Sequence, residues 1–523
     1  MSTTAPLRRT APERPRVRGQ AQALARERLA RIPTAGWICS LVALLTATAW
    51  SLIIPLFQAP DEPAHVAYAQ YLAETGSPPT GDNDKRPFSK QERQLLNAVQ
   101  WKAVIHRPQN EPPATATAHH LFDWLSDHQG NPVGAGGFTS ATNNPPLYYA
   151  AEAAVYHLTP SSSLPDRIHA MRLLSALLAA VTVLFVFLFL REVMPGTPWA
   201  WTVGALAVAF QPMFGFVSGG VNSDNLLFAA SAGAFWALAA SFRGGLTVER
   251  GAWIGALAAV GLIGKINMLG VLPGIGIGLL VLVGRSLPAE RREAVRGAVL
   301  ATGIVAAVAV VYMALNSIVW DRGLFFGSGG GHPLGSAAGA VGRVDPAHTP
   351  ARTIGDALSY GWQFYLPRLP FMNSFFFEFP LRHIWFNGFI GNFGWLDYRL
   401  PAAIYNVALA IAAVIAVLAG RELYLRRQVL RGRIGELATY VAMTLGLLIL
   451  VNGNGFAVRA DGSIGFEQAR YLFPLLALYA AIVALAARGI GRRYGPAVGV
   501  LIVTLAIAHT ALAMVVTLTR YYG

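Results

Sequence analysis

Residues 36–57 read GWICSLVALLTATAWSLIIPLF, an apolar run of 22 residues with no charged side chain. About 20 apolar residues are needed to cross a bilayer as a helix. The run therefore predicts a membrane-spanning helix. It is too long for a signal-peptide core, and no clear small-residue cleavage site accompanies it, so we expect an uncleaved first span.

The rest of the chain repeats this pattern. Of 523 residues, 54% are hydrophobic and only 13% are charged, and the mean hydropathy is +0.44. Such a composition is typical of polytopic membrane proteins, and no segment alternates as a membrane barrel strand would. We predict an all-α polytopic membrane protein with about eleven transmembrane helices. Further spans are expected near residues 168–190, 199–218, 223–242, 297–318, 401–419, 434–451, 470–487 and 496–518, with a two-helix hairpin within 251–284.

The polar segments divide the chain. Residues 1–35 are basic and predict a disordered cytoplasmic tail, and residues 36–523 form the transmembrane domain. Two long segments, 58–167 and 319–400, are too long to be simple connectors and predict large loop regions on the outer face. The second begins Gly-rich (Gly327, Gly329, Gly330, Gly331) and becomes aromatic, which suits interfacial helices.

The net charge of +14 is distributed unevenly. If the N-terminus is cytoplasmic, the inner segments hold 23 Lys/Arg and 8 Asp/Glu, the outer segments hold 17 and 19, and Lys265 lies within the membrane. This is the positive-inside pattern, so the charge does not indicate nucleic-acid binding. We expect a plasma-membrane protein surrounded by membrane lipids, with its C-terminus and large loops outside. The Ala/Arg/Gly-rich composition indicates a bacterial source.

The stretch QAPDEPAH, residues 58–65, follows the first span directly. Its adjacent carboxylates, Asp61 and Glu62, have two interpretations. They suit a general base or hard oxygen ligands for a divalent cation. Alternatively, Asp61 caps a helix that begins near Pro63. His65 would share the helical face of Asp61.

At this stretch the chain resembles a known family. The segment Pro60-Asp61-Glu62-Pro63-Ala64-His65, followed by Tyr68 and Tyr71, is similar to the first-loop signature of the GT-C superfamily of polytopic glycosyltransferases. The closest likeness is to a bacterial membrane family catalogued as a domain of unknown function. The segments that carry the rest of the likeness are Asn144-Pro145-Pro146-Leu147-Tyr148-Tyr149, Asn222-Ser223-Asp224-Asn225, Gly394-Trp395-Leu396-Asp397 and Gln468-Ala469-Arg470-Tyr471.

The resemblance implies a GT-C-like fold and a transferase. The donor would be a polyprenyl-phosphate-linked sugar, and the acceptor an envelope glycan, lipid or protein. Asp61 would be the general base of an inverting transfer, with Glu62 beside it in the catalytic role. His65, Asp224 and Tyr148 would position the acceptor or a metal.

Three residues are the candidates for binding the donor phosphate: Arg470, Lys265 and Tyr471. A fixed cation is needed there to balance the charge of the leaving group. No cofactor is certain, and a divalent cation such as Mg or Mn on Asp61, Glu62 and Asp224 is compatible with the residues.

Structural interpretations remain open for these residues. Arg470 could instead reach toward headgroups, Lys265 could be held at a helix break beside Asn267, and Asp224 could cap a helix. His119, His120 and Asp123 suggest a weak metal motif without a fourth ligand. The alternative function is a transporter or flippase of a lipid-linked sugar, although apart from Lys265 the spans carry few charges.

Overall fold

The computed structural model describes residues 32–80, 86–110, 115–130, 133–137, 140–159, 162–324, 342–343, 348–376, 381–464 and 467–523. Most of the expected N-terminal tail and the Gly-rich stretch 327–331 lie outside the described residues.

The described part of the chain is built on long apolar helices. Nine of them are long and apolar enough to cross a membrane, and the bent pair α9–α10 raises this count to ten. Our prediction of about eleven also counted α12. This helix has 17 residues and is too short to be among these ten. The helices are α2 (Thr34–Ile53), α8 (Leu164–Val193), α9 (Pro198–Ala209), α10 (Pro212–Ser218), α11 (Asp224–Gly244), α12 (Val248–Gly264), α13 (Met268–Arg285), α14 (Arg291–Ala314) with η2 (Leu315–Val319), α17 (Ala402–Leu425), α19 (Ile434–Ala460), η6 (Ala469–Leu475) with α20 (Leu476–Gly489), and α21 (Gly495–Tyr522).

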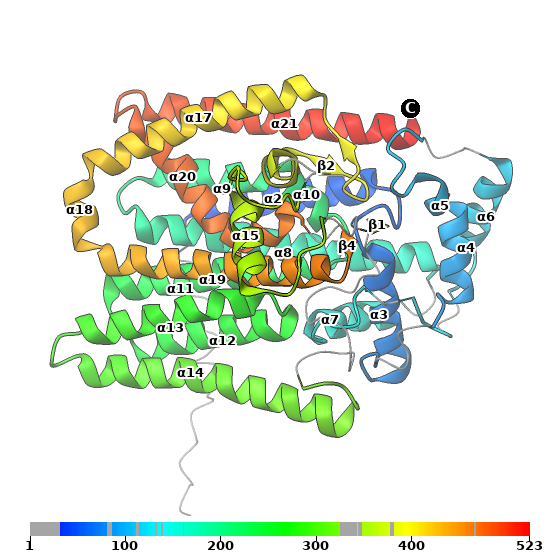
Figure 1. The fold of residues 1–523 in the computed structure, drawn as a ribbon, viewed down its shortest axis with the longest axis horizontal. Helices are drawn as coiled ribbons and strands as arrows, with labels where there is room; N and C mark the ends of the chain where they lie inside the picture. Colours follow the sequence, from blue (N-terminus) through cyan, green and yellow to red (C-terminus); the bar gives the residue numbers. More distant parts are fainter. Residues whose placement is uncertain are drawn as a thin grey trace, which may run out of the picture.

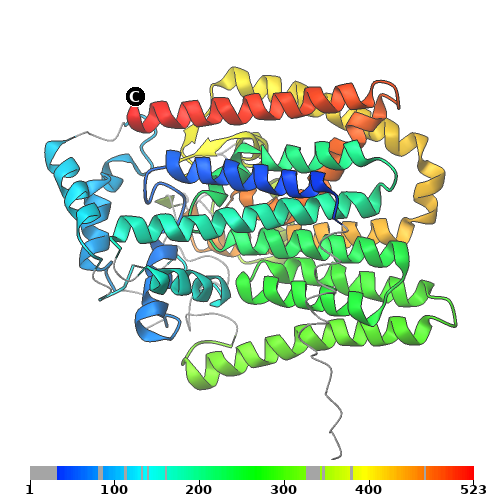
Figure 2. The same cartoon turned by 180° about the vertical axis from the view of Figure 1, so that it is seen from behind.

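These helices lie side by side in one bundle with two distinct ends (Figures 1 and 2). One end, here called the loop end, holds the C-terminus and the helices of the first long loop. The opposite end, here called the basic end, holds the Arg-rich turns and α18 (Arg427–Gly432). The predicted separation of basic turns from long loops is therefore present in the fold.

The break between α9 and α10 has a local cause in the sequence. Pro212 cannot continue the hydrogen-bond ladder of α9, because it lacks an N–H. The Gln211 side chain accepts a hydrogen bond from the Phe214 backbone N–H at 2.5 Å and so caps the new helix. The two helices bend by 59°. This bend places the end of α10 against the end of α2, where a Cβ on Gly219 would lie 2.8 Å from the Trp50 Cβ.

The first long loop is a folded subdomain and not a simple connector. It contains α3 (Glu62–Thr75), α4 (Lys90–Ala98), α5 (Trp101–Val104), α6 (Ala116–Asp127) and α7 (Leu147–Leu158). Tyr68, Tyr148 and Tyr149 are buried in a hydrophobic core of its own, separate from the core of the bundle. This second core holds α3 and α7 in fixed positions at the loop end.

The second loop region is less regular. It contains α15 (Ile354–Tyr365), η5 (Arg382–Asn387), α16 (Gly388–Ile390) and two small antiparallel pairs, β1 (Gly342–Arg343) with β4 (Ser463–Ile464) and β2 (Asn392–Phe393) with β3 (Tyr398–Arg399). α15 crosses the bundle axes in Figure 1, and its Ile354 and Leu358 are exposed, as expected of an interfacial helix. Phe364 and Phe375 are instead buried, so part of the aromatic run is core.

Close helix packing requires glycine at particular positions. A Cβ on Gly274 of α13 would lie 2.3 Å from the Met443 backbone nitrogen of α19, whereas a Cβ on Gly276 would meet nothing within 4 Å. Small residues allow this approach between helices in a membrane.

We expect Gly274→Ala to destabilise the protein by about 1–3 kcal/mol, because overpacking forces the backbones apart. Gly276→Ala is the matched control on the same helix, and it should leave stability unchanged or slightly raised. Thermal unfolding in detergent, followed by tryptophan fluorescence, measures both. Equal melting temperatures for the two variants would contradict this account of the α13–α19 contact.

Candidate functional site at the loop end

The Asp61 loop has a strained backbone. After α2 ends at Ile53, the chain turns through Phe57 and Asp61, with φ angles of 67° and 63°. Non-glycine residues rarely occupy this left-handed region, and they persist there only when surrounding contacts hold them. Such strain is common at functional sites.

Glu62 and Arg172 supply the contacts that hold this loop. The two side chains form a fully buried ion pair, with Arg172 Nη2 2.6 Å from Glu62 Oε2 and Nε 2.7 Å from Oε1. Glu62 also accepts from the backbone N–H groups of Phe57 and Val221. Its carboxylate therefore has four donors, which leaves no lone pair free for a metal or an acceptor. Glu62 positions the loop rather than facing a substrate.

Asp61 points away from the helix that it precedes. It occupies the N-cap position of α3, but its side chain makes no capping hydrogen bond. Instead Asp61 Oδ2 lies 2.5 Å from Arg470 Nη2. The Asp61 side chain is 23% exposed, whereas that of Arg470 is 3% exposed. The geometry thus disfavours the capping interpretation and leaves an accessible carboxylate.

The charges around Asp61 determine its protonation. Burial alone would raise the pKa of Asp61, but the Arg470 charge and hydrogen bond, with a smaller contribution from Lys265, hold the pKa below its usual value. Asp61 is therefore an ionised carboxylate at neutral pH. It is able to accept a proton, although its lowered pKa makes it a weak base while Arg470 is bound to it.

Asp224 and Lys265 complete an alternating network. Lys265 Nζ lies 2.6 Å from Asp224 Oδ1, and Arg470 Nε lies 3.8 Å from Asp224 Oδ2. Asp224 is the first residue of α11 and does not act as its N-cap. Lys265 lies in the break between α12 and α13. These contacts bring Asp224, Lys265 and Arg470 together with Asp61 in one cluster.

His65, Tyr68 and Tyr149 form a second group of contacting side chains in the site. His65 Nδ1 lies 2.7 Å from the Tyr149 hydroxyl, which also accepts from the Asn144 amide at 3.0 Å. The Tyr68 ring stacks on Tyr149 at 3.7 Å. Burial and the Lys265 charge lower the pKa of His65 to about 3, so its imidazole is neutral at physiological pH. His65 is thus a hydrogen-bonding neighbour and not a third cation.

Tyr148 and Tyr471 have different surroundings. The Tyr148 hydroxyl bonds to Ser175 Oγ at 2.8 Å and accepts from the Asn222 backbone N–H, so it holds the turn that precedes Asp224. Tyr471 lies under the Arg470 guanidinium, 5.6 Å from ring centroid to carbon. Tyr148 therefore stabilises the turn before Asp224, while Tyr471 orients the Arg470 guanidinium.

The metal interpretation finds no arrangement to support it. In the part of the chain that the structure describes, no three His, Cys, Asp or Glu side chains are grouped to hold an ion. Of the three proposed ligands, Glu62 is bound to Arg172, while Asp61 and Asp224 are already paired with cations. His119 and His120 of α6 likewise belong to no such group.

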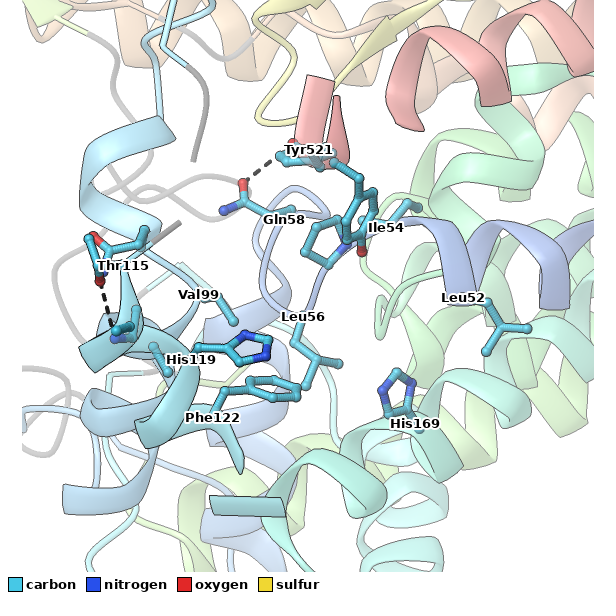
Figure 3. A pocket seen from close by; sticks show the side chains of 16 residues that line it. Leu52, Ile54, Leu56, Gln58, Val99, Thr115, His119, Phe122, His169 and Tyr521 are labelled. Atoms are coloured by element: carbon cyan, nitrogen blue, oxygen red, sulfur yellow. Dashed lines mark hydrogen bonds between the residues drawn. The ribbon is translucent and has the colours of Figure 1, made fainter. Parts of the chain in front are cut away.

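A cavity of about 620 Å³ lies beside the Asp61 loop (Figure 3). Leu52 of α2, His119 and Phe122 of α6, and His169 of α8 line it, and Tyr521 of α21 closes one side. The Tyr521 hydroxyl donates to Gln58 Oε1 at 3.4 Å. Because its walls are mainly apolar, the cavity suits a hydrocarbon group.

Sequence reasoning missed two arginines that shape the site. Arg172 in α8 binds Glu62, and buried Arg459 in α19 lies 3.3 Å from Glu467, which precedes the Arg470 segment. Both are charges within long apolar helices. A charge in such a segment is costly and requires a partner, and this was the available signal.

The fold and its spans define a polytopic helical membrane protein. A family model described as "Predicted membrane protein (DUF2142)" matches residues 44–479. The chain therefore belongs to this family of membrane proteins of unknown function, the kind of family that the motifs indicated. A comparison with curated proteins gives no match.

Removal of one partner from the Glu62–Arg172 pair should destabilise the fold strongly. We expect Arg172→Met to cost about 3–5 kcal/mol, since it leaves a buried carboxylate without a counter-ion. Arg243→Met is the control, because Arg243 is half-exposed in its pair with Glu192 and such pairs contribute about 0–1 kcal/mol. Thermal unfolding in detergent measures both. A loss for Arg172→Met no larger than for the control would refute the anchoring role.

Proposed function

We propose that this protein is a membrane glycosyltransferase. It moves a sugar from a polyprenyl-phosphate donor to an envelope glycan, lipid or protein at the outer face of a bacterial plasma membrane. The observation that carries the proposal is the accessible, ionised Asp61 in direct contact with the buried cation Arg470. A base and a phosphate-binding cation at one point are what this reaction requires.

The reaction balances with the groups present. The acceptor hydroxyl gives its proton to Asp61 as its oxygen attacks the anomeric carbon of the sugar. The bond from that carbon to the phosphate oxygen breaks, and the electron pair leaves with the polyprenyl phosphate. Attack opposite the leaving group inverts the anomeric configuration. Arg470, backed by Lys265, balances the charge that develops on the phosphate.

Donor binding would also activate the base. A phosphate that takes Arg470 away from Asp61 removes the main charge that lowers the Asp61 pKa. The carboxylate then becomes a stronger base only when the donor is in place. Arg470 is suited to this exchange because its Nε and Nη1 have no hydrogen-bond acceptor within the described structure.

The surroundings agree with a lipid-linked substrate. The apolar cavity beside the Asp61 loop has Leu52 in its wall, and this side chain is 69% exposed on the first spanning helix. Leu52 therefore joins the wall of the cavity to the exposed face of the first span, which suits a hydrocarbon chain. The loop end would face outward, because the Arg-rich turns of the basic end favour the cytoplasmic side.

Asp61→Asn tests the base. We expect transfer to fall by about 10²–10⁴-fold, since the amide cannot accept the proton. The assay gives the detergent-purified protein a radiolabelled polyprenyl-phosphate sugar pool and an envelope extract. Asp123→Asn, an exposed carboxylate on α6, is the control and should retain activity. Transfer that survives in Asp61→Asn would remove Asp61 as the base.

Arg470→Gln tests the donor site. We expect donor affinity to fall at least tenfold, about 1.4 kcal/mol, because the phosphate loses a bidentate charged partner. Binding of radiolabelled donor to the purified protein measures this, with the melting temperature as a check on folding. Unchanged affinity would exclude the phosphate role. Donor translocation in proteoliposomes without any transfer would favour a flippase.

A further inference from the structure

Arg322 is a further buried arginine at the loop end that the proposed reaction does not use. It follows the π-helical turn η2 at the end of α14, directly after Asp321, whose φ of 49° is left-handed. Its side chain is buried, whereas Asp321 before it and Leu324 after it are exposed. The guanidinium therefore lies just beneath the surface. π-helical turns are often found at functional sites.

The hydrogen bonding of Arg322 is incomplete. Nη2 donates to the Thr142 carbonyl at 2.6 Å, but Nε and Nη1 have no acceptor among the described residues. Two neighbouring polar atoms, the Tyr312 hydroxyl and Asn316 Oδ1, are likewise buried without a hydrogen-bond partner among the described residues. The Arg322 backbone N–H bonds to the Asn316 carbonyl, which ties these residues into one group.

Arg322 also differs in charge balance from three other buried arginines of the bundle. Arg172, Arg459 and Arg470 are buried, and each lies within 3.3 Å of a carboxylate. Within the described structure, no ion pair joins Arg322 to a carboxylate. An uncompensated buried charge costs several kcal/mol. Buried polar groups without partners call for an explanation, and a bound anion supplies one.

The group is continuous with the Asp61 site. Thr142 belongs to the turn that carries Asn144, whose amide donates to Tyr149. Tyr68 donates to the Asn144 carbonyl and stacks on Tyr149, the partner of His65. The Arg322 charge opposes the rise in the pKa of Tyr68 that burial causes. Arg322 is thus connected to His65 through the Thr142–Asn144 turn and Tyr149.

We propose that Arg322, with Tyr312 and Asn316, forms a second phosphate-binding site, distinct from Arg470. The free Nε–H and Nη1–H supply two donors to phosphate oxygens, and the Tyr312 hydroxyl supplies a third. A phosphate monoester that keeps one proton also donates to Asn316 Oδ1. This chemistry fits both a lipid-borne phosphate and a free phosphate ion. The inference does not rest on sugar transfer, because phosphate binding requires no reaction.

The test measures binding to the full chain in maltoside detergent. Radiolabelled polyprenyl phosphate is titrated against wild type, Arg322→Gln, Tyr312→Phe and Arg368→Gln. Arg368 is the matched control, because it is exposed and also donates to one backbone carbonyl, that of Met372. We expect affinity to fall at least tenfold in Arg322→Gln and several-fold in Tyr312→Phe, with no change in Arg368→Gln.

Competitors identify the source of the phosphate. Displacement by unlabelled polyprenyl phosphate but not by inorganic phosphate assigns the site to a lipid-borne phosphate. Equal displacement by inorganic phosphate assigns it to the free ion. Equal displacement by uncharged polyprenol of the same length would overturn the proposal, since the phosphate would then contribute nothing.

Two further outcomes separate this site from a structural strut and from the proposed reaction. A lower melting temperature of Arg322→Gln with unchanged affinity would show that Arg322 stabilises the fold without binding phosphate, and would overturn the proposal. If Arg322→Gln does not fold, Tyr312→Phe decides, and unchanged affinity there overturns it. Transfer that survives Asp61→Asn, with binding still dependent on Arg322, would refute the proposed base and leave this site standing.

Discussion

Glu62 and Arg172 form their ion pair where α2, α8 and the turn before α11 meet. All five N–H donors of Arg172 have an acceptor, and three of these bonds go to the carbonyls of Ser51, Ile54 and Pro55 at the end of α2. The last carbonyls of a helix have no partner within it. Arg172 therefore ends the first span, neutralises Glu62 and fixes the loop that presents Asp61, all with one side chain.

The Glu62–Arg172 ion pair gives the adjacent carboxylates of Asp61 and Glu62 different roles. Glu62 is completely bonded and buried, while Asp61 is turned by its left-handed backbone toward Arg470. The Asp61, Arg470, Asp224 and Lys265 cluster holds two formal charges of each sign and is neutral as it stands. An added anion would therefore compete with the carboxylates for Arg470 and Lys265. Because Asp61 is the more exposed of the two carboxylates, the proposed exchange would occur most easily there.

The spans were predictable because hydropathy is a local property. The predicted limits 434–451 and 496–518 fall within α19 and α21, and the break at Lys265 was visible as a polar interruption. The role of Asp61 was not predictable from its neighbours, because Pro60 and Pro63 resemble a helix start. Its actual partner is Arg470, 409 positions away. Local patterns predict caps, and only the fold brings such distant charges together.

The same reasoning explains which charges sequence analysis can find. Arg172 and Lys265 lie in or between apolar helices, so each must have a partner, and two carboxylates at the same end of the bundle, Glu62 and Asp224, provide it. Arg322 lies in a loop, where charged residues are common. The sequence therefore gives no indication that Arg322 requires a partner. What distinguishes Arg322 is its burial without an acceptor for two of its nitrogens, and this is a property of the folded chain alone. A charged residue in an apolar segment can be recognised from the sequence. A buried nitrogen without a hydrogen-bond acceptor can be recognised only when the neighbours of that atom are known.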